Sequence, residues 1–141
     1  MLIQGACHCR NITFTLRWEP DPTEFPARAC DCSFCMKHGG VWTSYPAGVL
    51  EVIVQDAAQV SAYSHGTRTA EFQVCGTCGV CPVVTSRIDE TLYAVVSVNA
   101  FENVDAGMVR RSATSFDGEQ ADDRLARRKR NWIGSVVVRI Q

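Results

Sequence analysis

Hydrophobic and polar residues alternate along much of the chain, which is the pattern of half-buried strands. Between residues 11 and 17, the apolar side chains of Ile12, Phe14 and Leu16 fall on one face and polar side chains fall on the other. Similar runs, rich in β-branched and aromatic residues, predict strands at 41–45, 49–54, 59–64, 68–75, 82–87, 92–99 and 135–140. The pattern therefore predicts a mainly β fold.

Two segments break this pattern. Pro20, Pro22 and Pro26 make residues 19–27 an extended connection, because proline restricts both itself and the residue before it. Residues 119–130 predict a helix, since acidic residues come first and basic residues last, in the order that a helix dipole favours. Within it, Asp123 is placed one turn before Arg127 and can pair with it. The expected fold thus contains one short C-terminal helix.

The C-terminal helix is also the most basic part of the chain. Residues 122–130 hold five basic and two acidic side chains, which allows an alternative function in binding nucleic acid or a protein partner, above all through residues 127–130. No aromatic residue is interleaved with these charges. We therefore interpret the basic residues as a solvated helix face and expect no nucleic acid binding.

Length and composition narrow the class of protein. A chain of 141 residues, 46% hydrophobic and 21% charged, predicts a single domain over 1–141 that buries a modest core. No apolar run approaches the roughly 20 residues of a membrane helix. The N-terminal residues lack both a basic head and a long apolar run, so we expect a cytoplasmic protein without a secretory leader. The net charge of -1 provides no overall field for nucleic acid or lipid.

The unusual feature of the composition is cysteine. The chain has 8 cysteines, and all of them fall in three tight groups. Disulfide frameworks usually spread their cysteines to close long loops, whereas short spacings are typical of metal sites. The groups are Cys7 and Cys9; Cys30, Cys32 and Cys35; and Cys75, Cys78 and Cys81.

Two of the groups together predict a four-thiolate site. Cys7 and Cys9 are two residues apart, so in a strand both sulfurs would project to the same face. Cys75 and Cys78 have the spacing of a zinc knuckle, in which Gly76 and Gly79 permit turn conformations that other residues resist. Four thiolates saturate a tetrahedral zinc ion, which then has a structural role.

The middle group predicts a second zinc site. Cys30, Cys32 and Cys35 supply three ligands, which leaves one tetrahedral position for water or substrate, and a thiol bound there is held as thiolate. The alternative is that Cys81 or His38 completes this site and makes it structural. Pro82 restricts Cys81 to extended angles at the exit of the knuckle, so we expect Cys81 to be a buried thiol without a metal.

The motifs that hold these cysteines resemble a known family. Gly5-Ala6-Cys7-His8-Cys9-Arg10-Asn11-Ile12, the segment from Cys30-Asp31-Cys32-Ser33-Phe34-Cys35 to Gly40, and Phe72-Gln73-Val74-Cys75-Gly76-Thr77-Cys78-Gly79 are similar to the glutathione-dependent formaldehyde-activating (GFA) family, which includes centromere protein V. The resemblance covers residues 5 to about 98. The segment 116–141, with its basic helix, differs from the formaldehyde-active members.

This resemblance implies a fold, two metal sites and an activity. The implied fold is a β-tent, and the implied ligands divide as above: four cysteines for a structural zinc and Cys30, Cys32 and Cys35 for a second zinc. Family members are carbon-sulfur lyases or S-(hydroxymethyl)glutathione synthases. We thus expect two zinc ions per chain and reversible joining of a small thiol, glutathione or a similar one, to an aldehyde. The rival expectation is a non-catalytic zinc module.

Weaker candidates complete the expected site. His38, three residues after Cys35, is a candidate proton carrier, whereas His8 and His65 are interpreted as turn or surface residues. Cationic side chains could meet the carboxylates of a glutathione-like substrate, and aromatic side chains near the second cysteine group could line a pocket or pack in the core. The cations are Lys37, Arg68 and Arg87, and the aromatic residues are Phe34, Trp42 and Tyr45.

Overall fold

Two β-sheets form the protein in a computed structural model that describes residues 1–141. A four-stranded sheet has the order β1-β2-β5-β11, and a seven-stranded sheet has the order β10-β3-β4-β9-β8-β7-β6. The strands are β1 (Leu2–Ala6), β2 (Ile12–Arg17), β3 (Phe25–Cys30), β4 (Val41–Thr43), β5 (Val49–Val54), β6 (Val60–Tyr63), β7 (Glu71–Cys75), β8 (Val83–Ile88), β9 (Thr91–Ser97), β10 (Val109–Thr114) and β11 (Ser135–Ile140). The helices are α1 (Ser33–His38) and α2 (Ala121–Asn131), with short 3₁₀ turns at Ala57–Gln59, Val98–Ala100 and Ala106–Met108.

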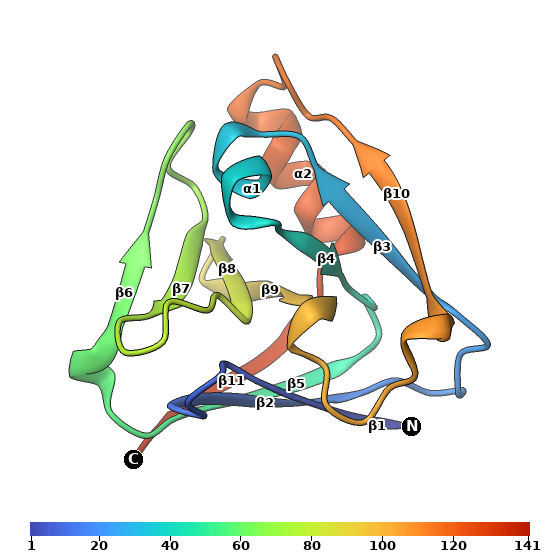
Figure 1. The fold of residues 1–141 in the computed structure, drawn as a ribbon. Coiled ribbons are helices and arrows are strands. Elements are labelled where there is room, and N and C mark those ends of the chain that lie inside the picture. Colours follow the sequence, from blue (N-terminus) through green and yellow to red (C-terminus); the bar gives the residue numbers. More distant parts are fainter.

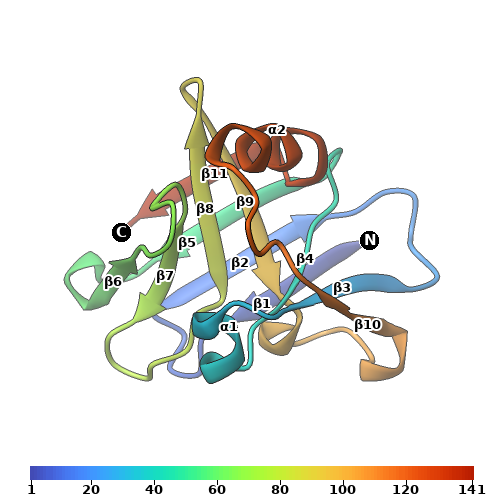
Figure 2. The ribbon, with the colours of Figure 1, turned by 90° about the horizontal axis from the view of Figure 1, so that it is seen from above.

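The seven-stranded sheet bends over the four-stranded sheet. Figure 1 shows the smaller sheet as a base, with β3 and β10 rising on one side of it and β6 and β7 on the other. Helices α1 and α2 lie between these two slopes, away from the base, and Figure 2 shows the same arrangement from above. Apolar side chains that are fully buried, such as Ile3, Leu16, Phe25 and Leu50, fill the space between the sheets.

The predicted mainly β fold is confirmed. In β2, Ile12, Phe14 and Leu16 are buried while the intervening threonines are partly exposed, as the alternation requires. Strands β5 and β11 have the predicted bounds, and they pair in parallel at the edge of the small sheet. The other predicted strands are found with their ends shifted by a few residues.

Three strands and one helix were not predicted from the sequence. Strand β3 includes residues 25–27 of the segment 19–27, which we expected to be an extended connection; these residues are extended, but they also pair within the sheet, which was not predicted. Pro26 is tolerated because β4 pairs only with Arg28 and Ala29 of β3. Strand β10 is an exposed edge strand without apolar alternation, and β1 is short. Helix α1 has only six residues, too few to show a helical period.

Helix α2 forms close to the predicted position, but its pairing differs. Glu119 precedes the helix and holds both Arg124 and Arg127, whereas the expected pair between Asp123 and Arg127 is not formed. The position of Glu119 before the first turn lets it reach two basic residues on one face of the helix. No helix of the structure combines the length and the apolar character needed to cross a membrane.

Candidate functional site

The first cysteine cluster has the geometry of a tetrahedral metal site. The Sγ atoms of Cys7, Cys9, Cys75 and Cys78 all lie within 4.8 Å of one another. Those of Cys9 and Cys75 are 3.5 Å apart, and those of Cys7 and Cys9 are 3.9 Å apart. Zinc-sulfur bonds of about 2.3 Å in a tetrahedron separate the sulfurs by roughly 3.8 Å. The four side chains therefore fit a zinc ion without rearrangement of the backbone.

Cys7 and Cys9 reach this cluster from a turn. We expected both residues in one strand, but β1 ends at Ala6, and the next residues form a turn closed by the Arg10 amide donating to the Cys7 carbonyl at 3.1 Å. Arg10 has a φ of 69°, which bends the chain back toward β2. The turn, and not the pleat of a strand, brings the two sulfurs together. The Ile12 amide donates to Cys7 Sγ at 3.3 Å and stabilises negative charge on that sulfur.

The knuckle that holds Cys75 and Cys78 uses its two glycines differently. Gly79 has a φ of +81°, and its amide donates to the Cys75 carbonyl at 2.8 Å, which closes the turn. Gly76 has no positive φ, but its amide donates to the Gln59 carbonyl at 2.6 Å. A Cβ at position 76 would lie 3.1 Å from that oxygen. The predicted role of Gly79 is confirmed, and Gly76 serves a close backbone approach instead.

The second cysteine cluster lies where β3 passes into α1. Cys30 is the last residue of β3, Cys32 caps α1 and Cys35 lies within it, and their Sγ atoms are within 4.8 Å of one another. Three N–H groups donate to these sulfurs: the Cys32 amide to Cys30 at 3.5 Å, the Cys35 amide to Cys32 at 3.4 Å, and Trp42 Nε1 to Cys35 at 3.4 Å. Such donors stabilise thiolates and orient them as ligands.

The cluster shares its protons unequally. A hydrogen bond from the Cys35 thiol, with others from the Cys32 amide and thiol, lowers the pKa of Cys30 to about 5. The same contact with Cys30, together with burial, raises the pKa of Cys35. The contacts therefore favour negative charge on Cys30 over Cys35, and a cation placed among the three sulfurs would favour the thiolate form of all three.

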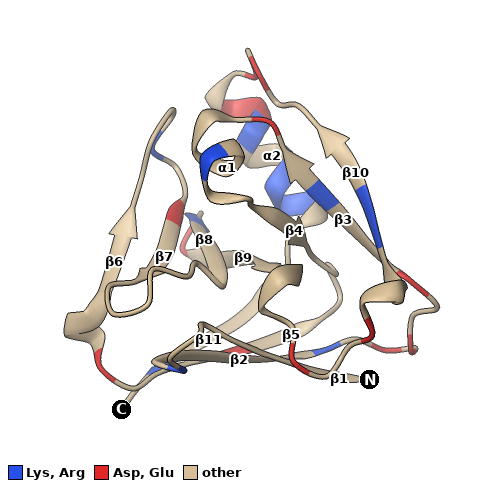
Figure 3. Ribbon diagram, viewed as in Figure 1, with Lys and Arg blue, Asp and Glu red and all other residues tan.

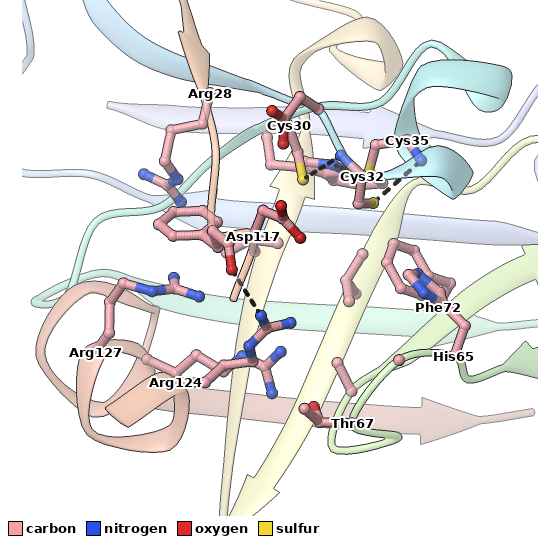
Figure 4. A pocket seen from close by; sticks show the side chains of 18 of the residues that line it. Arg28, Cys30, Cys32, Cys35, His65, Thr67, Phe72, Asp117, Arg124 and Arg127 are labelled. Carbon is pink, nitrogen blue, oxygen red and sulfur yellow. Dashed lines mark hydrogen bonds between the residues drawn. The ribbon is translucent and has the colours of Figure 1, made fainter. Parts of the chain in front are cut away.

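A cavity of about 560 Å³ opens beside this cluster. Its lining includes all three cysteines, the apolar side chains of Phe72 and Trp132, and charged residues from β3 and α2. In Figure 4, Cys30, Cys32 and Cys35 lie on one side, Arg124 and Arg127 lie on the other, and Asp117 lies between them. The volume is that of a site for a small molecule. None of the residues of the four-cysteine cluster lines this cavity or a smaller neighbouring one.

The basic face of α2 turns toward the cavity. Arg128 is only 6% exposed, and Arg124 and Arg127 are half-buried, so the expectation of a solvated basic face was wrong for these residues. Glu119 explains the difference, because its carboxylate lies 3.2 Å from Arg124 Nε and 3.0 Å from Arg127 Nε. Hydrogen bonds from Arg127 hold the pKa of Glu119 below its ordinary value. Figure 3 shows basic positions along α2 and one on β3.

The comparison with protein families identifies the chain. The model of the glutathione-dependent formaldehyde-activating enzyme (GFA) family matches residues 2–116, which include both cysteine clusters. The chain belongs to the GFA family. A solved structure of a Rhodobacter sphaeroides protein is similar, with 28% identity and a TM-score of 0.54, over 77% of this chain and 99% of that chain. No curated protein matches.

The matched GFA segment ends before α2. Residues after 116, including α2 and β11, lie outside the family match. Yet Arg124, Arg127, Arg128 and Trp132 from this segment line the cavity beside the second cluster. The cavity of this GFA protein therefore combines a cysteine cluster from the matched segment with a wall made by the C-terminal segment.

The other residues expected at the site lie in three places: in the cysteine cavity, in a neighbouring cavity, or in neither. Trp42 lines the cysteine cavity, while Lys37 and His38 line a neighbouring cavity of about 290 Å³. Arg68 is exposed and lines neither cavity. Of the aromatic residues expected either to line a pocket or to pack in the core, Phe34 lines the second cavity, and Tyr45 stacks on Trp18 with the ring centroids 4.8 Å apart. Arg87, a candidate for binding a substrate carboxylate, donates to the carbonyl of Glu90.

His65 is a lining residue that the sequence did not reveal. It lies between β6 and β7, contributes to both cavities, and its Nε2 atom is buried without a hydrogen-bond partner. Its ring stacks on Phe72 with the centroids 5.3 Å apart. A His-Gly pair in sequence indicates only a turn, so nothing local distinguished this histidine from the exposed His8.

Cys81 lies outside both clusters. It is 3% exposed, its Sγ donates to the Val83 carbonyl at 3.6 Å, and burial raises its pKa to about 12. A thiol held in this way does not attract a metal ion. We expect Cys81→Ala to retain the full metal content of the wild type and to lower the free energy of unfolding by only about 1 to 2 kcal/mol. Native mass spectrometry and chemical denaturation measure both; loss of one metal would show that Cys81 is a ligand.

Proposed function

We propose that the protein is a zinc-dependent carbon-sulfur lyase that joins a small thiol, glutathione or a similar one, to an aldehyde, or cleaves such an adduct. The observation that carries this proposal is the cluster of Cys30, Cys32 and Cys35 at the wall of a 560 Å³ cavity. The membership of the GFA family supports the choice of thiol and aldehyde as the substrate class.

The two clusters would hold zinc for different purposes. The four-cysteine cluster saturates the ion and ties the turn after β1 to the end of β7. Cys30, Cys32 and Cys35 would hold a zinc ion through three ligands; when bound, the ion would offer a fourth position to the sulfur of a substrate thiol and would lower the pKa of that thiol. The fit of both clusters rests on the sulfur separations described above and on the N–H groups that donate to the sulfurs.

The chain's own side chains would position the reactants and move the proton. Trp42 fixes Cys35 through its indole N–H, and Phe72 and Trp132 provide apolar walls that limit water around the reacting groups. Addition forms one carbon-sulfur bond, and the thiol proton ends on the former carbonyl oxygen. His65, with its free Nε2, is better placed in the cavity for this transfer than His38, which lines the neighbouring cavity.

The alternative function in nucleic acid binding has less support. Arg127 is engaged with Glu119, Arg128 is buried, and Lys129 is paired with Asp89. Of the basic run at the end of α2, Arg130 is the residue left exposed without an ion pair. A surface for phosphate groups requires several accessible cations. We therefore retain the enzymatic proposal.

The activity is testable by exchange spectroscopy. Glutathione and formaldehyde combine without a catalyst, so the measurement is the rate of exchange between free and adduct forms, followed by two-dimensional NMR. We expect zinc-loaded protein to raise this rate in proportion to its concentration, and chelator-treated protein to do so far less. Absence of acceleration with glutathione, together with a salt-sensitive gel shift that Arg130→Ala weakens, would contradict the proposal and favour the nucleic acid function.

A further inference from the structure

Four arginines line the same cavity as the three cysteines. Arg28 comes from β3, and Arg124, Arg127 and Arg128 come from α2. Glu119 neutralises part of this charge through its contacts with Arg124 and Arg127. Arg28 and Arg128 have no ion pair, although Asp31 and Asp117 also line the cavity. The cavity therefore contains two arginines that form no ion pair with a carboxylate.

Neutral groups hold these two arginines in place. Arg128 donates from Nη1 to the hydroxyls of Thr69 at 2.7 Å and Ser86 at 3.2 Å, and its Nε is buried without a partner. Arg28 donates from Nη2 to the Ser44 hydroxyl at 3.0 Å. Hydroxyl groups orient a guanidinium but do not cancel its charge. A buried guanidinium without an ion pair raises the free energy of the folded protein, and a bound anionic ligand would lower it.

The electrostatics of the cluster agree with this geometry. Burial, together with the nearby charges of Arg127 and Arg124, lowers the pKa of Arg128 to about 10. Arg28 lines the same cavity from β3, so two separate elements place positive charges around one cavity. The arginines from the two elements therefore repel one another, and a bound anion would reduce this repulsion.

We propose that Arg28 and Arg128 bind a carboxylate of the substrate, so that the cavity selects anionic thiols and adducts over neutral ones. This inference rests on the proposed function for the sulfur end of the ligand. Arg28 and Cys30 are two residues apart on β3, so the strand presents both to the same side. Arg128 lies over the Trp132 ring with its guanidinium carbon 4.9 Å from the centroid. A carboxylate at this position is bound by planar, preoriented donors.

The proposal assigns a role to the C-terminal segment. Arg128 belongs to α2, which follows the family match, while Arg28 belongs to the matched part. The proposed carboxylate site combines Arg28 of β3 with Arg128 of α2, which donates to Ser86 of β8. The segment 117–141 would thus determine which thiol this member of the family accepts.

Binding of S-methylglutathione to the zinc-loaded protein tests the inference. This probe keeps both carboxylates of glutathione but has no thiol, and calorimetry measures its affinity directly. We expect Arg128→Gln and Arg28→Gln each to weaken binding by about ten-fold to a hundred-fold, since each removes a charged hydrogen-bond donor. Arg130→Gln is the matched control: it removes the same charge from an exposed position of α2, and we expect a change of less than about two-fold.

The diethyl ester of S-methylglutathione separates the carboxylate contact from other effects. Wild-type protein should bind the ester more weakly than the acid, whereas the two arginine variants should bind both forms alike. Melting temperature and zinc content show whether each variant is folded. If Arg128→Gln does not fold, the affinity of Arg28→Gln and the comparison of acid with ester in the wild type still show whether the protein binds a carboxylate of the probe.

The outcomes for the two proposals are distinct. Equal affinity of wild type and both variants for the acid, or equal affinity of wild type for acid and ester, would overturn the carboxylate site even in an active enzyme. A protein that shows no thiol-aldehyde exchange but binds the acid through Arg28 and Arg128 would reject the proposed reaction alone.

Discussion

Cys75→Ser is expected to abolish stable folding. Cys75 is 0% exposed, and its sulfur belongs to the cluster that links the turn after β1 with the knuckle after β7. These segments are far apart in sequence, so a metal ion between them contributes directly to the free energy of folding. We expect the free energy of unfolding to fall by about 5 kcal/mol or more, which exhausts the stability of a typical domain of this size. Circular dichroism and thermal unfolding measure the loss.

Cys81→Ala is the matched control for this experiment. Both cysteines are buried and lie close in sequence, but only Cys75 belongs to a cluster. A large loss of stability in Cys75→Ser and a small one in Cys81→Ala would assign the effect to the metal site. Equal and small losses would show that the four-cysteine cluster does not hold the fold together.

Cys32→Ser is expected to separate activity from stability. The residue lies at the start of α1 beside the cavity, and its cluster is built from a single short stretch of chain. Removing this sulfur disturbs only local structure, so we expect a loss of less than about 2 kcal/mol in stability. The rate of thiol-aldehyde exchange should fall by at least about 100-fold, because the cluster loses a ligand. NMR exchange and thermal unfolding provide the two readouts.

Met36→Ala controls for disturbance of α1. Met36 is 68% exposed, lies in the same helix and lines neither cavity. Its activity should remain close to that of the wild type. If Cys32→Ser destabilises the protein as much as Cys75→Ser, the second cluster is structural, and the proposed enzymatic role loses its main support.

The cysteine clusters could be grouped from sequence because short spacings limit how ligands combine. The division into Cys7, Cys9, Cys75 and Cys78 and a separate trio was drawn from spacing, and the sulfurs assemble in these groups. The local conformation was harder to predict: the pair that we placed in a strand lies in a turn. The short spacing of Cys7 and Cys9 is compatible with a strand and with a turn. Which of the two forms depends also on tertiary contacts, such as the ion pair of Arg10 with Glu102.

The cavity could not be predicted from sequence because residues far apart form it. Arg28, His65 and Arg128 come from three separate segments, and nothing near each in the chain indicates that they meet. The basic run in α2 resembled a solvated face because Glu119 is five and eight residues from Arg124 and Arg127, spacings that do not form ion pairs within one helix. Glu119 reaches both arginines because the helix begins only at Ala121. Likewise, β10 lacks alternation because it is an exposed edge strand paired with β3.

X-ray absorption at the zinc edge tests the central claim most directly. We expect two zinc ions, one with four sulfur ligands and one with three, and hence an average of about 3.5 sulfurs per zinc in the free protein. Addition of glutathione should raise the average to about 4, as a substrate sulfur joins the three-cysteine cluster. An average that does not change when glutathione is added would contradict the proposal that this cluster binds the substrate thiol.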